Sequence, residues 1–349
     1  MSIRTILVCE AQVPFVQGGA ELHVRALVRQ LRARGYLAEL VSLPFKWYPK
    51  EEILAHAAAW RLLDLSESNG RPVDLVIGTK FPSYFARHDN KVVWLIHQYR
   101  AAYELCGTEY SDFDHVEADV GLRDTLLELD TRMLAECRRL FTNAGNTAGR
   151  LKKFNGLEAR PLYHPPQLAD RIRPGQYGSY VLCVGRLETV KRPQLAIEAM
   201  AQVDSGMRLV VAGDGTQRAN LEALASRLGV DDRVDFLGAV GDEELLSLYA
   251  DARAVVYVPY DEDFGYVTLE AFLARKPVVT CRDSGGTLEF VVDGVNGAVC
   301  EPTADALAAA ISRYAASPAL AAAHGEAGET RARAITWDGV VEALVGAGS

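Results

Sequence analysis

Short apolar runs alternate with segments of helical periodicity along the whole chain. Several of these runs are apolar on consecutive residues, which is typical of parallel strands covered by helices on both faces. Strand, helix and strand repeated in this order favours a doubly wound α/β structure. The predicted strands are TILVCE (5–10), AELVSL (38–43), VDLVIGT (73–79), KVVWLIH (91–97), RLFTNA (139–144), YVLCVGRL (180–187), RLVVAGDG (208–215), VDFLGAV (234–240), AVVYVPY (254–260), PVVTC (277–281) and GAVCE (297–301).

One helix is indicated with particular clarity. In GGAELHVRALVRQLRARGY (18–36), the apolar side chains between Val24 and Leu31 fall on one face, and the arginines at 25, 29 and 32 fall on another. Gly35 stands where a left-handed residue would end the helix. We interpret the arginine row as a solvated face, with contact to a membrane surface as the alternative.

Prolines and glycines gather without periodicity at 162–180, which predicts a linker. With 349 residues the chain also exceeds the usual size of a single domain. We expect a Rossmann-like domain at 1–168, a linker at 169–178, a second Rossmann-like domain at 179–331 and a last segment at 332–349. The carboxyl ends of both sheets should face a cleft between the two domains.

Charge and cysteine content narrow the classes of function. The formal net charge of −9 repels nucleic acid, so nucleic-acid binding is set aside. The six cysteines form no CxxC pair, and we interpret them as thiols in a reducing compartment. The first residues lack the apolar core of a signal peptide, and no apolar run is long enough to span a bilayer. We therefore expect a cytoplasmic protein that is at most peripheral to a membrane.

Two glycine-marked loops follow predicted strands, where an open α/β sheet binds its ligands. Gly18 and Gly19 open the arginine-bearing helix and would let the backbone approach an anion, with an ordinary turn as the alternative. Gly213 and Gly215 suggest a dinucleotide fingerprint, but Arg218 stands where its third glycine belongs. Hydride chemistry therefore loses support, and a tight turn beside a nucleotide fits that loop equally well.

A basic loop, VGRLETVKRP (184–193), follows the first predicted strand of the second half. Arg186 and Lys191 lie on this loop, just before a helix that Pro193 starts. A guanidinium fork and a flexible ammonium on one loop suit a diphosphate, with a solvated basic loop as the alternative.

Two glutamates bracket a helix start in DEDFGYVTLEAFLARKPVVT (261–280). Eight helical steps would separate Glu262 and Glu270 by about 12 Å along the axis and roughly 80° in rotation. Because the helix is expected to begin near Gly265, Glu262 stays in the loop and both carboxylates can face one cleft. Amides near Gly265 and Tyr266 form a further anion site. In a nucleotide-sugar site, one carboxylate would meet the sugar and the other the ribose; an acidic helix N-terminus is the alternative.

The spacing Glu262-DFGYVTL-Glu270, followed by Lys276-Pro-Val-Val, resembles the E-x7-E signature of retaining glycosyltransferases with the GT-B fold. With GGAE near the start and GRL…KRP in the second half, the chain is similar to glycosyltransferase family four, the group 1 transferases. The resemblance covers the whole chain and is strongest over 180–303. It implies a first domain that binds the acceptor, a second that binds the nucleotide-sugar donor, and a last helix that returns to the first.

The resemblance also implies a role for each motif residue. Arg186 and Lys191 would neutralise the donor diphosphate and the charge that develops on the leaving group. Glu262 would meet hydroxyls of the transferred sugar. His97, at the end of KVVWLIH, would lie at the reacting sugar, with a structural histidine as the alternative. The residues implied to contact the donor and its nucleotide are Gly18, Gly19, Gly213, Gly215, Phe264, Gly265, Tyr266, Val267 and Glu270.

Two features depart from the family pattern. Asp263 stands where the family usually has proline or glycine, and residues 271–275 read AFLAR in place of the small-residue AMACG. Asp263 adds negative charge near the donor sugar, so whether it or Glu262 contacts that sugar stays open.

No metal and no cofactor are expected. Acidic pairs such as Asp112 and Asp114 are interpreted as loop residues, because Arg186 and Lys191 already supply the positive charge that a metal would bring. The resemblance therefore implies a metal-independent retaining hexosyltransferase that uses a UDP- or GDP-linked sugar and a saccharide or lipid-linked acceptor in surface polysaccharide or glycolipid biosynthesis. The alternatives are a nucleotide-sugar epimerase of the same fold and a non-catalytic nucleotide-sugar-binding protein.

Overall fold

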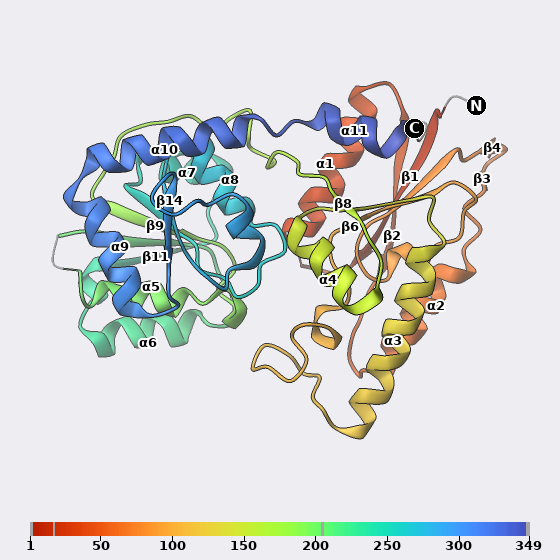
Figure 1. Cartoon of the computed structure of the whole chain (residues 1–349), viewed down its shortest axis with the longest axis horizontal. Coiled ribbons are helices and arrows are strands. Elements are labelled where there is room, and N and C mark those ends of the chain that lie inside the picture. The colour runs from red at the N-terminus through yellow and green to blue at the C-terminus, as the bar shows by residue number, and fades with distance from the viewer. Residues whose placement is uncertain (1–2, 17, 204–205, 347–349) are drawn as a thin grey trace. The chain divides into compact units, whose positions relative to one another are not determined.

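The structure is a computed structural model that describes residues 3–16, 18–203 and 206–346. The chain forms two units, each built around its own parallel sheet (Figure 1). The first unit contains the chain up to Gln167 and again from Thr336, and the second runs from Leu168 to Ile335. The chain therefore passes between the units twice, and its last described helix belongs to the first unit.

The first unit has a six-stranded parallel sheet with the order β2-β1-β5-β6-β7-β8. Successive side chains point to opposite faces, so Val8 and Cys9 of β1 belong to separate apolar cores. Helices α1 and α11 cover the face of Val8, and α2, α3 and α4 cover the face of Cys9. The elements are β1 (Thr5–Gln12), α1 (Gly19–Ala33), β2 (Leu37–Pro44), α2 (Glu52–Leu62), β3 (Glu67–Ser68), β4 (Arg71–Pro72), β5 (Leu75–Gly78), η1 (Ser83–Phe85), β6 (Lys91–Leu95), η2 (Arg100–Ala102), α3 (Glu117–Ala135), β7 (Arg139–Thr142), α4 (Gly145–Asn155), β8 (Arg160–Pro161) and α11 (Trp337–Val345).

The second unit repeats this plan with the strand order β11-β10-β9-β12-β13-β14. Val181 and Cys183 of β9 point into a core that α5, α6 and α9 cover, while α8 packs on β12 and β13 and against α10. The elements are β9 (Tyr180–Val184), η3 (Thr189–Lys191), α5 (Pro193–Met200), β10 (Arg208–Ala212), α6 (Arg218–Leu228), η4 (Asp231–Arg233), β11 (Val234–Gly238), α7 (Asp242–Asp251), β12 (Ala254–Val256), α8 (Tyr266–Leu273), β13 (Val278–Cys281), η5 (Gly285–Glu289), β14 (Gly297–Cys300), α9 (Ala304–Ala316) and α10 (Pro318–Arg333).

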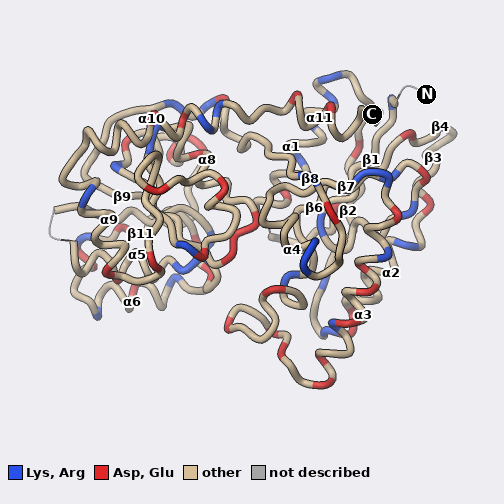
Figure 2. Tube along the Cα trace, viewed as in Figure 1, with Lys and Arg blue, Asp and Glu red and all other residues tan. Residues whose placement is uncertain are grey.

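The doubly wound α/β prediction is confirmed, because each of the eleven predicted runs overlaps a strand of one of the two parallel sheets. Helix α1 lies where the apolar period places it, and Gly35 follows it with a left-handed φ of 87°. The pattern does not predict β8 or the antiparallel β3–β4 pair, since two-residue strands of polar residues and proline have no apolar period. Acidic and basic residues are mixed along both units (Figure 2).

Parallel strands place the loops at their carboxyl ends along one edge of each sheet. In the first unit this edge carries the loops that follow β1, β5 and β6, and in the second unit those that follow β9, β10, β12 and β13. The predicted site residues lie on these loops or in the helices that begin after them.

Candidate functional site

In the second unit, the two loops that follow β9 and β10 lie directly against each other. The backbone N–H of Leu187 donates to the carbonyl of Asp214 at 2.9 Å. A Cβ on Gly213, whose φ is 148°, would lie 1.9 Å from the carbonyl oxygen of Gly185, and a Cβ on Gly215 would lie 2.6 Å from that of Leu187. The close approach of these two loops therefore requires both glycines, and the loop that carries Arg186 is held in place by it.

The arginines of the basic loop lie in different environments: Arg186 is exposed and Arg192 is buried. Arg186 is exposed, and no hydrogen bond or ion pair within the described residues holds its side chain. Arg192, by contrast, is buried and makes a bidentate pair with Asp283 at 2.6 and 2.7 Å, and its guanidinium also donates to the carbonyls of Val258 and Pro259. Arg192 thus fixes the loop to the ends of β12 and β13 and leaves Lys191 as the neighbouring cation of the site.

Lys191 forms an ion pair with Glu262, and the Tyr257 hydroxyl donates to the same carboxylate oxygen, Oε2, at 2.8 Å. The side chains of Lys191 and Glu262 are only 21% and 13% exposed, so the pair is largely shielded from water. Burial, followed by the charge of Glu262, raises the pKa of Tyr257 well above its ordinary value, so the phenol remains a donor. The predicted diphosphate cation and the predicted sugar-binding carboxylate are therefore neighbours.

The loop at residues 284–286, which the sequence reasoning missed, holds the backbone of Glu262. Gly286 donates its N–H to the carbonyl of Glu262 at 2.7 Å, and Glu262 donates to the carbonyl of Ser284 at 3.3 Å. A Cβ on Gly285 would lie 2.6 Å from the backbone nitrogen of Glu262. Two adjacent glycines in the loop after a predicted strand are the signal that identified Gly18 and Gly19, and the same signal would have found this loop.

Helix α8 begins at Tyr266, and Gly265 precedes it with a left-handed φ of 76°. The first amides of a helix have no acceptor within the helix, so they can bind an anion. The side chains of Phe264 and Val267 are buried, and the ring of Phe264 packs against those of Tyr266 and Phe290. Only backbone groups of Phe264 and Val267 are therefore suited to contact a donor. Asp263 is also buried.

Glu270 lies in the second turn of α8, as its spacing predicts, and Tyr249 of α7 donates a 2.7 Å hydrogen bond to its Oε2. Burial raises the pKa of Glu270, and the hydrogen bond from Tyr249 opposes that rise. Glu262 in its loop and Glu270 in its helix are thus each held by a different tyrosine of the second unit.

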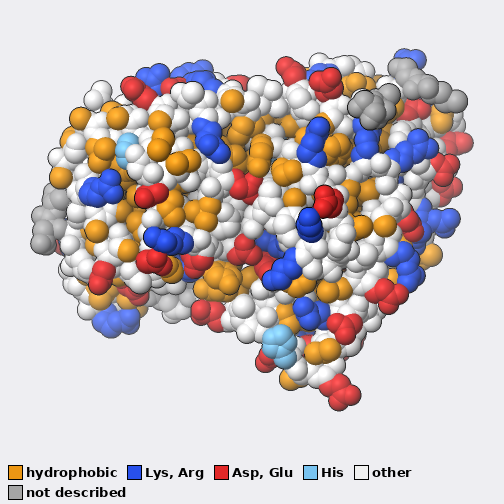
Figure 3. Space-filling model, viewed as in Figure 1, with side chains coloured by type: hydrophobic (Ala, Val, Ile, Leu, Met, Phe, Trp, Pro, Cys, Tyr) orange, Lys and Arg blue, Asp and Glu red, His pale blue; other side chains and the backbone are white. Residues whose placement is uncertain are grey.

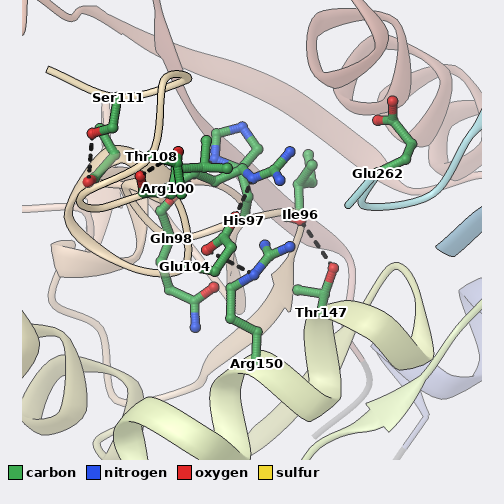
Figure 4. A network of polar contacts seen from close by, with 12 residues as sticks. Ile96, His97, Gln98, Arg100, Glu104, Thr108, Ser111, Thr147, Arg150 and Glu262 are labelled. Carbon is green, nitrogen blue, oxygen red and sulfur yellow. Dashed lines mark hydrogen bonds and ion pairs between the residues drawn. The ribbon is translucent and has the colours of Figure 1, made fainter. Parts of the chain in front are cut away.

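In the first unit, His97 follows strand β6 by two residues and is half-buried. Its Nδ1 lies 2.8 Å from the carbonyl oxygen of Gln98 (Figure 4). A carbonyl oxygen only accepts hydrogen bonds, so Nδ1 carries the proton and Nε2 has the lone pair in the neutral ring. The N–H of Phe81 donates to the His97 carbonyl at 3.1 Å, which fixes the backbone there.

Figure 4 also shows an ion-pair cluster drawn with His97. The carboxylate of Glu104 pairs with Arg100 of η2 and, at 2.9 Å, with Arg150 of α4. The side chains of Arg150 and Glu104 are only 3% and 10% exposed. Two guanidinium groups around one carboxylate leave this group of three side chains with a net positive charge. Sequence reasoning missed Arg150, because a single arginine in a helical pattern is ordinarily a solvated residue.

Gly18 is the N-cap of α1, and its N–H donates to Oε2 of Glu21 at 2.8 Å. Glu21 also pairs with Lys80, and both side chains are buried. Gly19, the first residue of α1, is exposed. The predicted glycine turn is therefore a helix start held by a buried ion pair.

Two further observations concern metals and membranes. Across 3–16, 18–203 and 206–346, no group of three or more His, Cys, Asp or Glu residues is arranged to hold a metal ion. The Asp112 carbonyl accepts a hydrogen bond from Lys50, and Asp114 donates its N–H to Asp119, so both belong to local loop structure. No helix in the same ranges is long and apolar enough to cross a bilayer. On the face drawn in Figure 3, apolar side chains are scattered among charged ones.

Comparison with known proteins finds similarity to glycosyltransferases. Residues 172–331 match the family model described as "Glycosyl transferases group 1". The chain is 27% identical over 339 residues to a D-inositol 3-phosphate glycosyltransferase of Segniliparus rotundus, an alignment that covers 88% of this chain and 74% of the relative. A relative of the same description from Acidothermus cellulolyticus is 32% identical over 241 residues, covering 61% of this chain and 53% of its own. The chain thus spans between about half and three quarters of these relatives.

Two solved structures show the likeness of the fold. Sucrose-phosphate synthase from Thermosynechococcus elongatus superposes with a TM-score of 0.76 at 20% identity, covering 98% of this chain and 97% of that one. Anabaena HepE in complex with UDP-glucose superposes with a TM-score of 0.70 at 19% identity, covering 94% of both chains. At such identities the likeness shows the fold alone.

Proposed function

We propose that the chain, which has the GT-B fold and matches the group 1 glycosyltransferase model over residues 172–331, is a glycosyltransferase of that group. It would transfer a hexose from a nucleotide-diphosphate sugar to an acceptor hydroxyl with retention of anomeric configuration. The observation that carries the proposal is the group of Lys191, Glu262 and Glu270 around the start of helix α8. This group combines a cation for phosphate, a helix N-terminus for an anion, and two carboxylates for hydroxyl groups.

The second unit supports donor binding. Lys191 on its loop, together with the exposed Arg186, would neutralise the diphosphate and the charge that develops on the leaving phosphate, which is the largest kind of catalytic contribution. Glu270 would accept hydrogen bonds from the ribose, and Glu262 from the transferred sugar. Because two basic side chains supply this charge, we propose that transfer does not need a metal ion.

The first unit supports the acceptor side. His97 would contact the reacting sugar through the imidazole edge opposite its bond to Gln98. Retention would proceed by attack of the acceptor on the same face that the phosphate leaves, with a phosphate oxygen taking the proton of the acceptor hydroxyl. The C1–O bond to phosphate breaks, and a C1–O bond to the acceptor forms.

We further propose that the donor is UDP- or GDP-linked and that the acceptor is a saccharide or lipid-linked saccharide of surface polysaccharide or glycolipid biosynthesis. The solved relative with bound UDP-glucose and the inositol-phosphate glycosyltransferases support a nucleotide sugar and a hydroxyl acceptor. A lipid-linked acceptor fits a cytoplasmic enzyme that touches the membrane periphery, and the partly exposed arginines of α1 are the surface suited to it.

The test is turnover of purified protein with a panel of UDP- and GDP-hexoses and a mixture of saccharide acceptors, followed by mass spectrometry. The proposal expects stoichiometric release of one nucleoside diphosphate with a new glycoside whose anomeric configuration, measured by NMR, equals that of the donor. Conversion of the sugar nucleotide into its epimer without any glycoside would support the epimerase instead. Binding without turnover of any donor would support a non-catalytic binding protein.

A further inference from the structure

Two buried tyrosines of the second unit hold the two glutamates of the donor site. The hydroxyl of Tyr249 on α7 donates to Oε2 of Glu270 at 2.7 Å, and the hydroxyl of Tyr257, directly after β12, donates to Oε2 of Glu262 at 2.8 Å. Tyr249 is fully buried, and Tyr257 is 7% exposed. Each carboxylate thus has its own phenolic donor, supplied by a different element.

Other buried or half-buried tyrosines of this unit satisfy their hydroxyls elsewhere. Tyr180 donates to the Leu248 carbonyl at 2.7 Å, Tyr177 donates to the Arg275 carbonyl at 2.8 Å, and Tyr314 pairs with His324 at 2.9 Å. A backbone carbonyl or a buried histidine therefore suffices as the hydrogen-bond acceptor of a phenol in this core. Tyr249 and Tyr257 instead direct their hydroxyls at the two carboxylates on which the proposed chemistry depends.

The hydrogen bond from Tyr249 fixes the rotation of the Glu270 carboxylate. It occupies Oε2, and within the described part of the chain no side chain or amide donates to Oε1. A charge-assisted hydrogen bond of this kind also favours the ionised carboxylate, which accepts hydrogen bonds from hydroxyl groups. Oε1 of Glu270 is therefore kept as an oriented acceptor.

The arrangement at Glu262 differs, because Lys191 and Tyr257 share the same oxygen. If Lys191 turns toward a diphosphate, its ion pair with Glu262 is lost. Tyr257 lies in the core and cannot follow it, so its hydrogen bond keeps the carboxylate in place.

We propose that Tyr249 and Tyr257 are positioning residues of sugar transfer: Tyr249 aims Glu270 at the nucleotide ribose, and Tyr257 retains Glu262 for the transferred sugar when Lys191 engages the diphosphate. The inference rests on the proposed function, since it takes the ligand to be a nucleotide sugar. The two tyrosines support different steps: Tyr249 supports nucleotide binding, and Tyr257 supports transfer of the sugar. The experiments therefore measure nucleotide binding for Tyr249 and turnover for Tyr257.

Tyr249→Phe is tested by calorimetric titration with whichever of UDP, GDP and ADP the wild type binds, and with its 2′-deoxy analogue. Wild type should bind the ribonucleotide roughly tenfold more tightly than the deoxy analogue, because a hydrogen bond to a charged group is at stake. Tyr249→Phe should lose most of that preference by weakening the ribonucleotide alone. Tyr314→Phe, which removes another buried hydroxyl of the same unit, is the matched control and should keep it.

The pH profile gives a second measure of the same bond. The titratable groups around Glu270 are Tyr249, Asp242, Tyr257 and Tyr266. Without the Tyr249 hydroxyl the pKa of Glu270 rises further. As the pH is lowered, Glu270 is therefore protonated earlier in Tyr249→Phe, and ribonucleotide binding should be lost at a higher pH than in wild type. Equal weakening of both nucleotides with an unmoved profile would make Tyr249 a packing residue and overturn its assignment.

Tyr257→Phe should lower kcat about tenfold or more while nucleoside-diphosphate binding stays within roughly twofold of wild type. Loss of nucleotide affinity with kcat preserved would contradict the role assigned to Tyr257.

If Tyr249→Phe folds poorly, Glu270→Gln alone must abolish the preference for the ribonucleotide over its 2′-deoxy analogue. If that preference persists in Glu270→Gln, the assignment of Tyr249 is refuted. If the wild type binds no nucleoside diphosphate, the proposed function itself is contradicted. That result differs from one in which the wild type binds a nucleotide and the tyrosine variants bind and turn over as the wild type does, which contradicts only the roles of the tyrosines.

Discussion

The ammonium of Lys191 and the carboxylate of Glu262 form an ion pair at the start of helix α8, on two loops 71 residues apart in the sequence. In the proposed function, Lys191 of this pair would bind phosphate and Glu262 would bind sugar hydroxyls. A donor that offers a diphosphate and a sugar presents partners for both groups at once. The proposal therefore assigns the two side chains to the two parts of one substrate.

Lys191→Ala should abolish transfer, with kcat/KM reduced at least a hundredfold, because the charge that develops on the leaving phosphate loses its partner. Circular dichroism should show an intact fold. Lys152→Ala is the control, since Lys152 also pairs with a glutamate, Glu158, but both side chains are exposed. Near wild-type activity of Lys191→Ala on the true donor would show that the site is assigned wrongly.

His97→Ala should lower kcat roughly a hundredfold, whereas the Kd of the donor should change much less, because the proposal assigns the histidine to the reacting sugar and not to the nucleotide. Steady-state kinetics and calorimetry on the same preparation measure the two quantities. His88→Ala, which removes another half-buried histidine of the first unit, should leave both unchanged. Equal losses in turnover and donor binding would make His97 structural.

Arg192→Lys should destabilise the second unit by about 3 kcal/mol, because lysine cannot reproduce the bidentate contact with Asp283 and leaves that charge poorly paired. Arg208→Lys is the matched control. Arg208 makes a comparable bidentate pair with Asp235, but both side chains are about 40% exposed, so the change should be near zero. Thermal unfolding of the three proteins measures the difference, and equal melting temperatures for both variants would contradict the anchoring role of Arg192.

The first unit should lose stability in mild acid. Burial lowers the pKa of His164 to about 3, and burial also lowers that of the adjacent His23. Below pH 6.5 the unfolded chain therefore binds more protons than the folded one, and the free energy of unfolding falls as the pH falls. His164 alone contributes a loss of about 2 kcal/mol between pH 7 and 5.

Urea unfolding followed by tryptophan fluorescence measures this loss, since all four tryptophans (Trp47, Trp60, Trp94 and Trp337) lie in the first unit. His164→Asn should be less stable at pH 7 but should lose less between pH 7 and 5 than wild type. An identical pH slope in both proteins would mean that His164 does not titrate on unfolding in this range.

The sequence predicts the architecture well, because buried parallel strands consist of consecutive apolar residues. Runs such as KVVWLIH and AVVYVPY need no tertiary information to be recognised. The sequence also predicts where the motif residues Lys191, Glu262 and Glu270 lie around the start of α8, since their spacing is local; their roles stay predictions.

What the sequence does not reveal depends on contacts between distant segments. The pairing of Tyr249 with Glu270 joins α7 to α8, and no local pattern distinguishes this tyrosine from an ordinary core residue. The different environments of Lys191 and Arg192 likewise depend on Asp283, which lies about 90 residues further along. The sequence suggested a nucleotide contact for Gly213 from its partial dinucleotide fingerprint, whereas the structure shows that its close approach to Gly185 already requires a glycine there.

The most direct test of the account is calorimetric titration of wild type and Glu270→Gln with UDP, GDP, ADP and NAD, first without metal and then with magnesium. The account predicts micromolar binding of one nucleoside diphosphate by wild type, unchanged by magnesium, and binding roughly tenfold weaker or worse in Glu270→Gln. Binding of NAD alone, or equal nucleotide affinity in both proteins, would contradict the donor site proposed for the second unit.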